Sequence, residues 1–236
     1  MPPRESRKKL SFGSGPCDPR SVLIVEGINP FHFILRMFGD AIQRNRIYLF
    51  DGGGRDNLDH ALSLIIDTDG FNENIRAVGL LYDAEADAQQ TAHQIRGALD
   101  RVRLPVPQQP LVPARLSAGD GCGIATAYLI LPHGRESGCF EHALLPGYRN
   151  SPRVGGASAT EACVDAVLEC AGRPATITEN GRDNWVAKAR VHTLIALSVQ
   201  PEATLAESGL CGVWDVSHPS IDPIAQLIEL LGASSQ

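Results

Sequence analysis

The chain has 236 residues, and its 43% hydrophobic content supplies enough apolar material for one large domain or for a domain with a small appendage. Its 27 acidic and 21 basic residues give a net charge of −6, which argues against a protein that coats nucleic acid through bulk positive charge. The composition leaves a local contact with nucleic acid open, because bound metal ions would bring their own positive charge.

Cysteine usage and hydropathy bear on where the protein works. The six cysteines include no CxxC pair, so a structural zinc site is not predicted, and Cys163 and Cys170 fit a buried helical face better than a pair of ligands. No signal peptide and no apolar run of membrane-spanning length is visible. We therefore expect reduced thiols, a cytoplasmic protein and no membrane contact.

The first twenty residues differ in composition from the rest of the chain. Residues 1–20 are polar, contain proline, glycine and serine, and carry several basic side chains. This composition predicts a disordered leader, with a nucleic-acid-binding arm as the alternative. From residue 21 onward, short apolar runs alternate with helical patterns.

Strands and helices alternate over the first two thirds of the chain. Buried apolar runs predict strands at 21–25, 46–50, 75–82 and 126–131. The first helix is expected to have Asn29 as its cap and Pro30 in its first position. The proline-rich stretch 104–113 predicts a loop or an edge excursion. This alternation predicts an α/β fold, with a central parallel sheet of about four strands and helices on both faces.

The last third is predicted to be helical. A short helix begins near residue 140, and a break containing glycine and proline follows at 148–157. Further helices are expected at 160–171, 184–198 and 222–231. The predicted organisation is a leader at 1–20, an α/β domain at 21–147, and a helical extension at 148–236 that packs on the domain or beside it.

Carboxylates follow two of the predicted strands. Glu26 and Gly27 come directly after the first strand, and Asp83, Glu85 and Asp87 follow the third. Ligands bind where parallel strands end, and hard carboxylate oxygens gathered there suit Mg²⁺ or Mn²⁺. The alternative is that these acids only cap the helices that follow, where the helix dipole favours negative charge. Their pairing across two strand ends favours the metal site.

Other side chains near strand ends extend this candidate site. Gly53, Gly54 and Arg55 follow the second strand, where bare amides and an arginine can hold a phosphate, although a plain tight turn explains them equally well. Glu141 follows the fourth strand and is a candidate for a second metal. Lys188 is a candidate phosphate-facing or catalytic lysine, with a solvated helix face as the alternative. The absence of HExxH and GxSxG argues against zinc proteases and serine hydrolases.

Together these residues resemble the Toprim domain, the metal-binding fold of topoisomerases, bacterial primases and OLD-type nucleases. The family pattern is a glutamate after the first strand and Asp-x-Asp after a later one, positions held here by Glu26, Asp83 and Glu85. The chain is most similar to the small stand-alone Toprim-like bacterial proteins. The motifs that carry this likeness are Val25-Glu26-Gly27 with His32-Phe33 behind it, Gly53-Gly54, Gly138-x-x-Glu141 and the segment 214–219. The resemblance covers residues 21–145 well and the remainder loosely.

The resemblance implies metal-dependent hydrolysis of phosphodiester bonds in DNA or RNA, with one or two Mg²⁺ or Mn²⁺ ions. The implied metal ligands are Glu26, Asp83, Glu85, Asp87 and Glu141. The implied catalytic residues are Glu26, Asp83, Glu85 and Lys188. Residues implied to contact phosphate are Gly27, Gly53, Gly54 and Arg55. Two departures stand out: Asn29 and Pro30 lie where the family often has a further acid, and Glu85 replaces the second aspartate.

The resemblance also suggests partners. OLD-type nucleases work with an ATPase, so a separate ATPase partner and a role in phage defence are expected by analogy, together with nucleic acid and a second copy of the chain. The alternative is a Toprim-like binding or sensor module that no longer cuts and that recognises a nucleotide, nucleic acid or a partner protein. A nucleotide-hydrolysing or phosphotransfer enzyme ranks last, because no nucleoside pocket is recognisable in the sequence.

Overall fold

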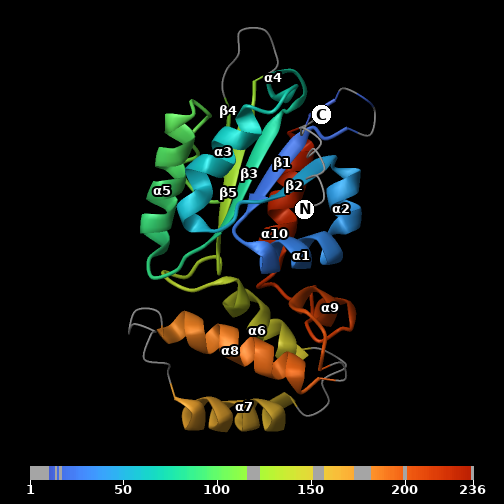
Figure 1. Ribbon diagram of the computed structural model, residues 1–236, viewed down its shortest axis with the longest axis vertical. Coiled ribbons are helices and arrows are strands. Elements are labelled where there is room, and N and C mark those ends of the chain that lie inside the picture. The colour runs from blue at the N-terminus through green and yellow to red at the C-terminus, as the bar shows by residue number, and fades with distance from the viewer. Residues whose placement is uncertain are drawn as a thin grey trace, which may run out of the picture.

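A computed structural model gives the fold of the chain (Figure 1). The structure describes residues 11–13, 15, 18–115, 123–150, 157–172, 182–198 and 201–234. Most of the leader predicted at 1–20 lies outside these residues, as does most of the break predicted at 148–157.

Five strands form one sheet in the order β2-β1-β3-β5-β4. The four longer strands run parallel and are β1 (Ser21–Val25), β2 (Ile47–Asp51), β3 (Ala77–Asp83) and β5 (Ala125–Leu131). The two-residue β4 (Ala114–Arg115) pairs antiparallel with β5 at the edge. The predicted α/β fold with a central parallel sheet is confirmed, and β4 adds the antiparallel edge to it.

Each face of the sheet is covered by its own helices. One face carries α3 (Leu58–Ile66), α4 (Phe71–Asn74) and α5 (Ala88–Arg101). The other carries α1 (Ile28–Met37), α2 (Gly39–Arg44) and α10 (Asp222–Ala233). Because side chains alternate along a strand, Val22 and Ile24 join the first core, and Leu23 and Val25 join the second. Every residue of β1, β3 and β5 is buried, as expected for parallel strands covered on both faces.

A second group of helices lies beyond the carboxyl ends of the parallel strands (Figure 1). It consists of α6 (Phe140–Asn150), α7 (Ala157–Ala171) and α8 (Arg182–Ala196). α8 packs on both α6 and α7, and α9 (Leu205–Leu210) packs on α1. The chain then returns to the sheet, where α10 contacts the four parallel strands. The predicted helical C-terminal part is confirmed, and the boundary predicted at 147/148 falls inside α6.

The start of α1 differs from the prediction. The helix begins at Ile28 and its N-cap is Gly27, with no side-chain cap bond, so the prediction of Asn29 as the cap is wrong. Gly27 has a φ of 84°, a backbone conformation that glycine adopts without a steric penalty. This conformation turns the chain from β1 into α1 within two residues and leaves Glu26 at the turn.

Three further features were not anticipated in the sequence. Phe12, inside the predicted leader, is only 2% exposed and packs edge-on against Tyr48 with ring centroids 5.6 Å apart. Helix α9 starts at a capping box in which Thr204 and Glu207 bond reciprocally, a signal that is readable in sequence. Cys163 and Cys170 are exposed on α7, so the prediction that they are buried is wrong.

Among the described residues, no helix combines the length and the apolar character that a membrane crossing needs.

Gly147 is a point of close backbone approach between α6 and the segment after Trp214. The Asp215 N–H donates to the Gly147 carbonyl at 3.0 Å, and a Cβ built on Gly147 would lie 2.8 Å from the Asp215 carbonyl oxygen. Backbone must therefore move, and we expect Gly147→Ala to lower the free energy of unfolding by roughly 1–3 kcal/mol. Urea denaturation measures the change.

Gly97 in α5 supplies the matched control. A Cβ there would meet only the flexible end of the Arg101 side chain, at 3.3 Å. Gly97→Ala should therefore stabilise the protein by about 0.5–1 kcal/mol through the helix preference of alanine. Equal stabilities of the Gly147→Ala protein and the parent would contradict the proposed packing of α6.

Candidate functional site

The site begins where the sheet connections change direction. From β1 the chain crosses to β2 on one side, and β3 then lies on the other side of β1. In open parallel sheets, ligands bind in the crevice at such a switch point. Glu26 follows β1 and Asp83 ends β3, so both carboxylates lie at this crevice. The Asp83 N–H donates to Glu26 Oε2 at 2.9 Å.

Asp83 is held from the other side by α6. Its Oδ1 accepts a hydrogen bond of 2.8 Å from the Phe140 N–H. Asp83 as a whole is only 8% exposed. The Asp83 backbone thus holds the Glu26 carboxylate, and the first residue of α6 holds the Asp83 carboxylate. A buried carboxylate in this position needs further positive charge or a proton, because hydrogen bonds alone offset only part of its desolvation.

Glu85 is placed by an unusual backbone conformation. Its φ is 53°, in the left-handed region that residues with side chains rarely adopt. Two backbone bonds with Gly138 hold it there, Glu85 N–H to Gly138 O at 2.7 Å and Gly138 N–H to Glu85 O at 2.8 Å. Asn184 of α8 donates its Nδ2 to Glu85 Oε2 at 2.7 Å. Strained residues held by several contacts are common at functional sites.

Glu141 adds a fourth carboxylate from the first turn of α6. The residue is 4% exposed, and its Oε2 is buried without any hydrogen-bond partner among the described residues. Burying a carboxylate oxygen without a hydrogen-bond partner lowers the stability of the folded state, so the presence of one in a native structure needs an explanation. A bound cation or a ligand donor would supply the missing interaction.

α8 directs a row of polar side chains at these acids. Asn184, Lys188 and His192 are spaced four residues apart and therefore share one face of the helix. Lys188 and His192 line the cavity, and Asn184 contacts Glu85. Lys188 was predicted as a site residue, whereas Asn184 and His192 were missed. Their four-residue spacing with Lys188 is the signal that would have found them.

The charges of the site perturb one another. Burial raises the pKa of Asp83, and the negative charges of Glu26 and Glu141 raise it further, against the opposing effect of Lys188. Burial also raises the pKa of Glu26, although the hydrogen bond from the Asp83 backbone lowers it in part. For Lys188, burial alone would lower the pKa, but the surrounding carboxylates, Glu141 first, outweigh it and raise the pKa.

The glycine loop after β2 forms the neighbouring wall. Gly54 lines the cavity, and the Arg55 backbone, at the start of the short helix η1 (Arg55–Asn57), hydrogen-bonds Glu26. Two donors close by are buried without a partner among the described residues, Arg55 Nη2 and the Tyr82 hydroxyl. The Tyr82 hydroxyl would lie 3.0 Å from a Cβ on Gly52. The loop thus has unused donors beside the acids, as an anion site would require.

A Cys–His–Asp alignment beside the acids does not form a nucleophilic triad. Cys139 Sγ lies 3.4 Å from His142 Nδ1, and His142 Nε2 lies 3.1 Å from Asp183. However, Nδ1 already accepts the Cys139 backbone N–H. Cys139 is fully buried, and burial together with Glu141 and Asp83 raises the pKa of its thiol. A thiol that resists ionisation in this way is a poor nucleophile.

A cavity of about 270 Å³ collects most of the predicted site residues. Those that line it are Glu26, Gly27, Gly54, Asp83, Glu85, Glu141 and Lys188. Three predicted residues, Gly53, Arg55 and Asp87, do not line it. The Asp87 carboxylate caps α5 by accepting from the Gln89 and Gln90 N–H groups, and Gly53 donates its N–H to Asp51. Arg55 bonds Gln94 through Nε, with its backbone at Glu26.

The carboxylates are not converged on one point. Within the part of the chain that the structure describes, no group of three or more His, Cys, Asp and Glu side chains is arranged to hold a metal ion. Glu26, Asp83 and Glu85 each give one oxygen to an N–H donor instead. The arrangement is an acidic crevice with a lysine facing it, on an α/β sheet.

The fold and the crevice define an α/β protein with a candidate ligand site at its topological switch point. The chain belongs to the family described as "Protein of unknown function (DUF3226)", whose model matches residues 20–232. This match includes every residue that lines the crevice.

Comparisons with other proteins add one structural likeness. A search of curated proteins finds no match to the chain. The C-terminal region of the OLD protein of Xanthomonas campestris pv. campestris, phased with mercury, is 16% identical with a TM-score of 0.38. That alignment covers 92% of this chain and 98% of the other.

The raised pKa of Asp83 predicts a specific dependence of stability on pH. Above its ordinary pKa of 3.8, the folded state binds more protons at Asp83 than the unfolded state does, so stability falls as pH rises. In EDTA, we expect Asp83→Asn to melt about 2–4 °C above the parent at pH 8, the shift that ~1 kcal/mol gives at this size. The two melting temperatures should converge towards pH 4.

Melting curves recorded by circular dichroism between pH 4 and pH 8 test this expectation. Glu229→Gln, which removes an exposed carboxylate paired with Arg44, is the control and should follow the parent. A constant difference between Asp83→Asn and the parent across this range would show that Asp83 is not destabilised by ionisation.

Proposed function

We propose that this protein is a metal-dependent phosphodiesterase that hydrolyses DNA or RNA at the acidic crevice. The observation that carries the proposal is the burial of two carboxylates, Asp83 and Glu141, beside Glu26 and Glu85 in one cavity at the switch point, with Glu141 Oε2 unpartnered among the described residues. The Toprim resemblance of Glu26, Asp83 and Glu85 leads to the same chemistry from the sequence alone.

The donor set fits a hard divalent cation. Four carboxylates and one lysine surround the cavity, and burial together with the neighbouring negative charges raises the pKa values of Glu26 and Asp83. Mg²⁺ commonly keeps several waters and takes only one or two protein carboxylates together with substrate phosphates. A preformed group of three protein ligands is therefore not required. One or two of the carboxylates of Asp83, Glu85 and Glu141 would hold the cation, with Mn²⁺ as a substitute of similar ligand preference.

When bound, the cation would supply charge to the phosphate and acidify a water molecule in its shell. The side chains of the protein would accept the proton and stabilise the developing charge. Glu26 has a raised pKa, which brings it closer to neutral pH and suits it to accept a proton from the attacking water. As the water oxygen bonds to phosphorus and the ester bond breaks, Lys188 would stabilise the charge that develops on the phosphate oxygens.

The glycine loop would hold the neighbouring phosphate. Arg55 Nη2 and the Tyr82 hydroxyl are donors without partners among the described residues, the first from η1 after the glycine loop and the second from β3. Arginine binds phosphate oxygens strongly because it offers several donors in one plane. This part of the proposal assigns Arg55 to binding and orientation rather than to proton transfer.

A binding or sensor module is the second candidate function. It is favoured by the absence, among the described residues, of three acidic or histidine ligands arranged around one point. In this function the crevice would bind a nucleotide or nucleic acid and release it unchanged. The ATPase partner, the role in phage defence and the pairing of two copies remain predictions from the resemblance.

Cleavage of plasmid DNA and of total RNA in Mn²⁺ and in Mg²⁺ tests the proposed function. We expect the parent to cut one of them, and Glu26→Gln and Asp83→Asn to lose roughly 10²–10⁴-fold in rate, as removal of a proton acceptor or a charged ligand does. Glu229→Gln, on the exposed surface of α10, should cut like the parent.

The possible outcomes separate the two functions. Equal cutting by the parent, Glu26→Gln and Asp83→Asn would assign the activity to a contaminant and contradict the proposal. Binding of nucleic acid without any cutting would favour the sensor module instead.

A further inference from the structure

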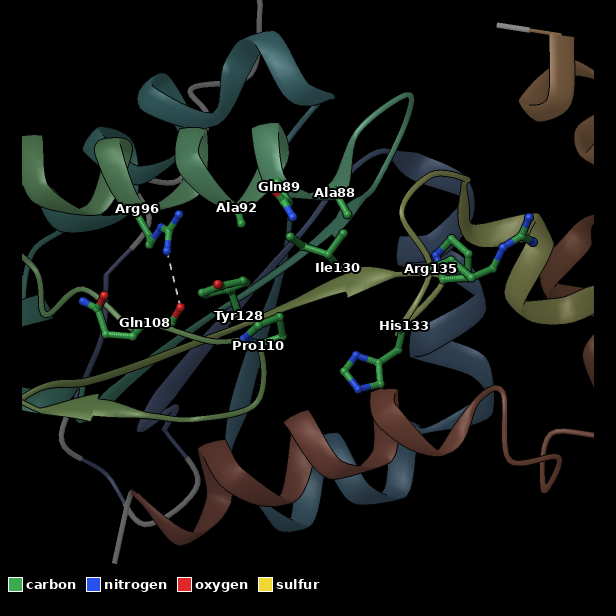
Figure 2. A pocket seen from close by; sticks show the side chains of 12 residues that line it. Ala88, Gln89, Ala92, Arg96, Gln108, Pro110, Tyr128, Ile130, His133 and Arg135 are labelled. Atoms are coloured by element: carbon green, nitrogen blue, oxygen red, sulfur yellow. Dashed lines mark hydrogen bonds between the residues drawn. The ribbon is translucent and has the colours of Figure 1, made fainter. Parts of the chain in front are cut away.

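A second cavity lies on the α5 side of β5, separate from the acidic crevice (Figure 2). Its volume is about 420 Å³, within the range of sites that enclose a small organic ligand. The walls come from α5, from β5, from the loop before β4 and from the loop between β5 and α6. None of the residues that line it lies among those lining the crevice.

The charge of this cavity is opposite to that of the crevice. Arg96, His133 and Arg135 line it, and no acidic residue is among the described residues around it. Arg96 has no carboxylate partner in the described part of the chain, and its Nη1 donates only to the Gln108 carbonyl, at 3.4 Å. Arg135 pairs with Asp183 at 3.8 Å, which leaves Arg96 as the arginine of this cavity without a carboxylate partner in the described part of the chain. In a chain of net charge −6, a cavity lined by such an arginine and by no described acid favours an anion.

Tyr128 points to a ligand independently of this charge. The residue is 1% exposed, yet no described residue forms a hydrogen bond with its hydroxyl. The ring is buried, whereas the hydroxyl is not among the fully buried unpartnered atoms of the described residues and is therefore accessible from the cavity. The hydroxyl of a largely buried tyrosine usually finds a partner. Figure 2 shows the Tyr128 side chain beside Arg96 and Gln108, with His133 and Arg135 towards the other end of the cavity. A ligand acceptor at this position would satisfy both the hydroxyl and the guanidinium.

The remaining surface is apolar or carries amides. Ala88, Ala92, Pro110, Ile130 and Pro132 form flat, uncharged walls. Two amide side chains, Gln89 and Gln108, stand at the rim. An inorganic phosphate would leave these walls uncovered, whereas a planar ring would bury them and offer edges to the amides.

We propose that this cavity binds a nucleoside phosphate, with the phosphate at Arg96 and Tyr128 and the base on the apolar wall. This site is distinct from the acidic crevice, and the proposal does not depend on catalysis at the crevice. Its position next to the crevice follows from the loop between β5 and α6. That loop supplies Pro132, His133 and Arg135 to the cavity, and it continues to Gly138, which pairs with Glu85.

Two sources of this ligand share the same chemistry, a free mononucleotide and a nucleotide within a strand. Calorimetric titration of the full chain in EDTA, which removes any metal-dependent binding at the crevice, distinguishes them. The probes are AMP, UMP, adenosine, inorganic phosphate and a short single-stranded oligonucleotide. We expect AMP or UMP to bind, or the oligonucleotide alone if the source is a strand. Phosphate and adenosine should each bind at least tenfold more weakly than the nucleotide, because each makes half of the contacts.

Variants assign the binding to this cavity. Arg96→Gln should weaken it roughly tenfold or more, and Tyr128→Phe, which keeps the ring, by about threefold to tenfold. Arg101→Gln is the matched control, because this arginine lies on the same helix but pairs with Asp59 at the surface. Arg101→Gln should bind like the parent, and all variants should melt cooperatively.

Four results would overturn the proposal. The first three are no binding of any nucleotide probe, binding of phosphate as tight as that of the nucleotide, and nucleotide binding that survives in folded Arg96→Gln. A loss of binding in Arg101→Gln equal to that in Arg96→Gln would also overturn it, because the effect would then be one of net charge.

Discussion

The surrounding structure must compensate the negative charge of the carboxylates that lie at the ends of β1 and β3. Glu26 and Asp83 lie at the switch point of the sheet, where strand ends leave a crevice. Glu85 and Glu141 join them from the loops and helices that follow. Placing like charges together away from water is unfavourable unless donors or cations compensate. The backbone N–H groups of Asp83 and Phe140, the Asn184 amide and Lys188 supply part of that compensation.

The helices beyond the sheet contribute groups that contact the carboxylates of the crevice. α6 brings the Phe140 N–H and Glu141, and α8 brings a row of polar side chains that face the acids. α10 then returns to cover the sheet, and its Leu231 carbonyl accepts the Ser21 hydroxyl at 3.0 Å. The α6–α8 layer is therefore one wall of the site, and the crevice would be open to solvent without it.

Much of the fold could be predicted because buried strands leave strong apolar runs. The four parallel strands lie within two residues of their predicted bounds, and Glu26, Asp83, Glu85, Glu141 and Lys188 do meet at one cavity. Asp87 could not be separated from the others by sequence, since an acid at a strand end and an acid capping a helix look alike. Asn184 and His192 share a four-residue spacing with Lys188 that is visible in the sequence, but only tertiary packing places this face of α8 against the acids. Phe12 was missed because its partner Tyr48 is distant in sequence.

The central claim is that the buried acids are completed by a divalent cation, and Mn²⁺ binding tests it most directly. Free Mn²⁺ is measured by electron paramagnetic resonance as it is titrated into the metal-free parent and into Asp83→Asn at pH 7.5. We expect saturable binding by the parent and at least tenfold weaker binding by Asp83→Asn, because one buried carboxylate ligand is lost. Absence of binding by the parent, or equal binding by both proteins, would contradict the account.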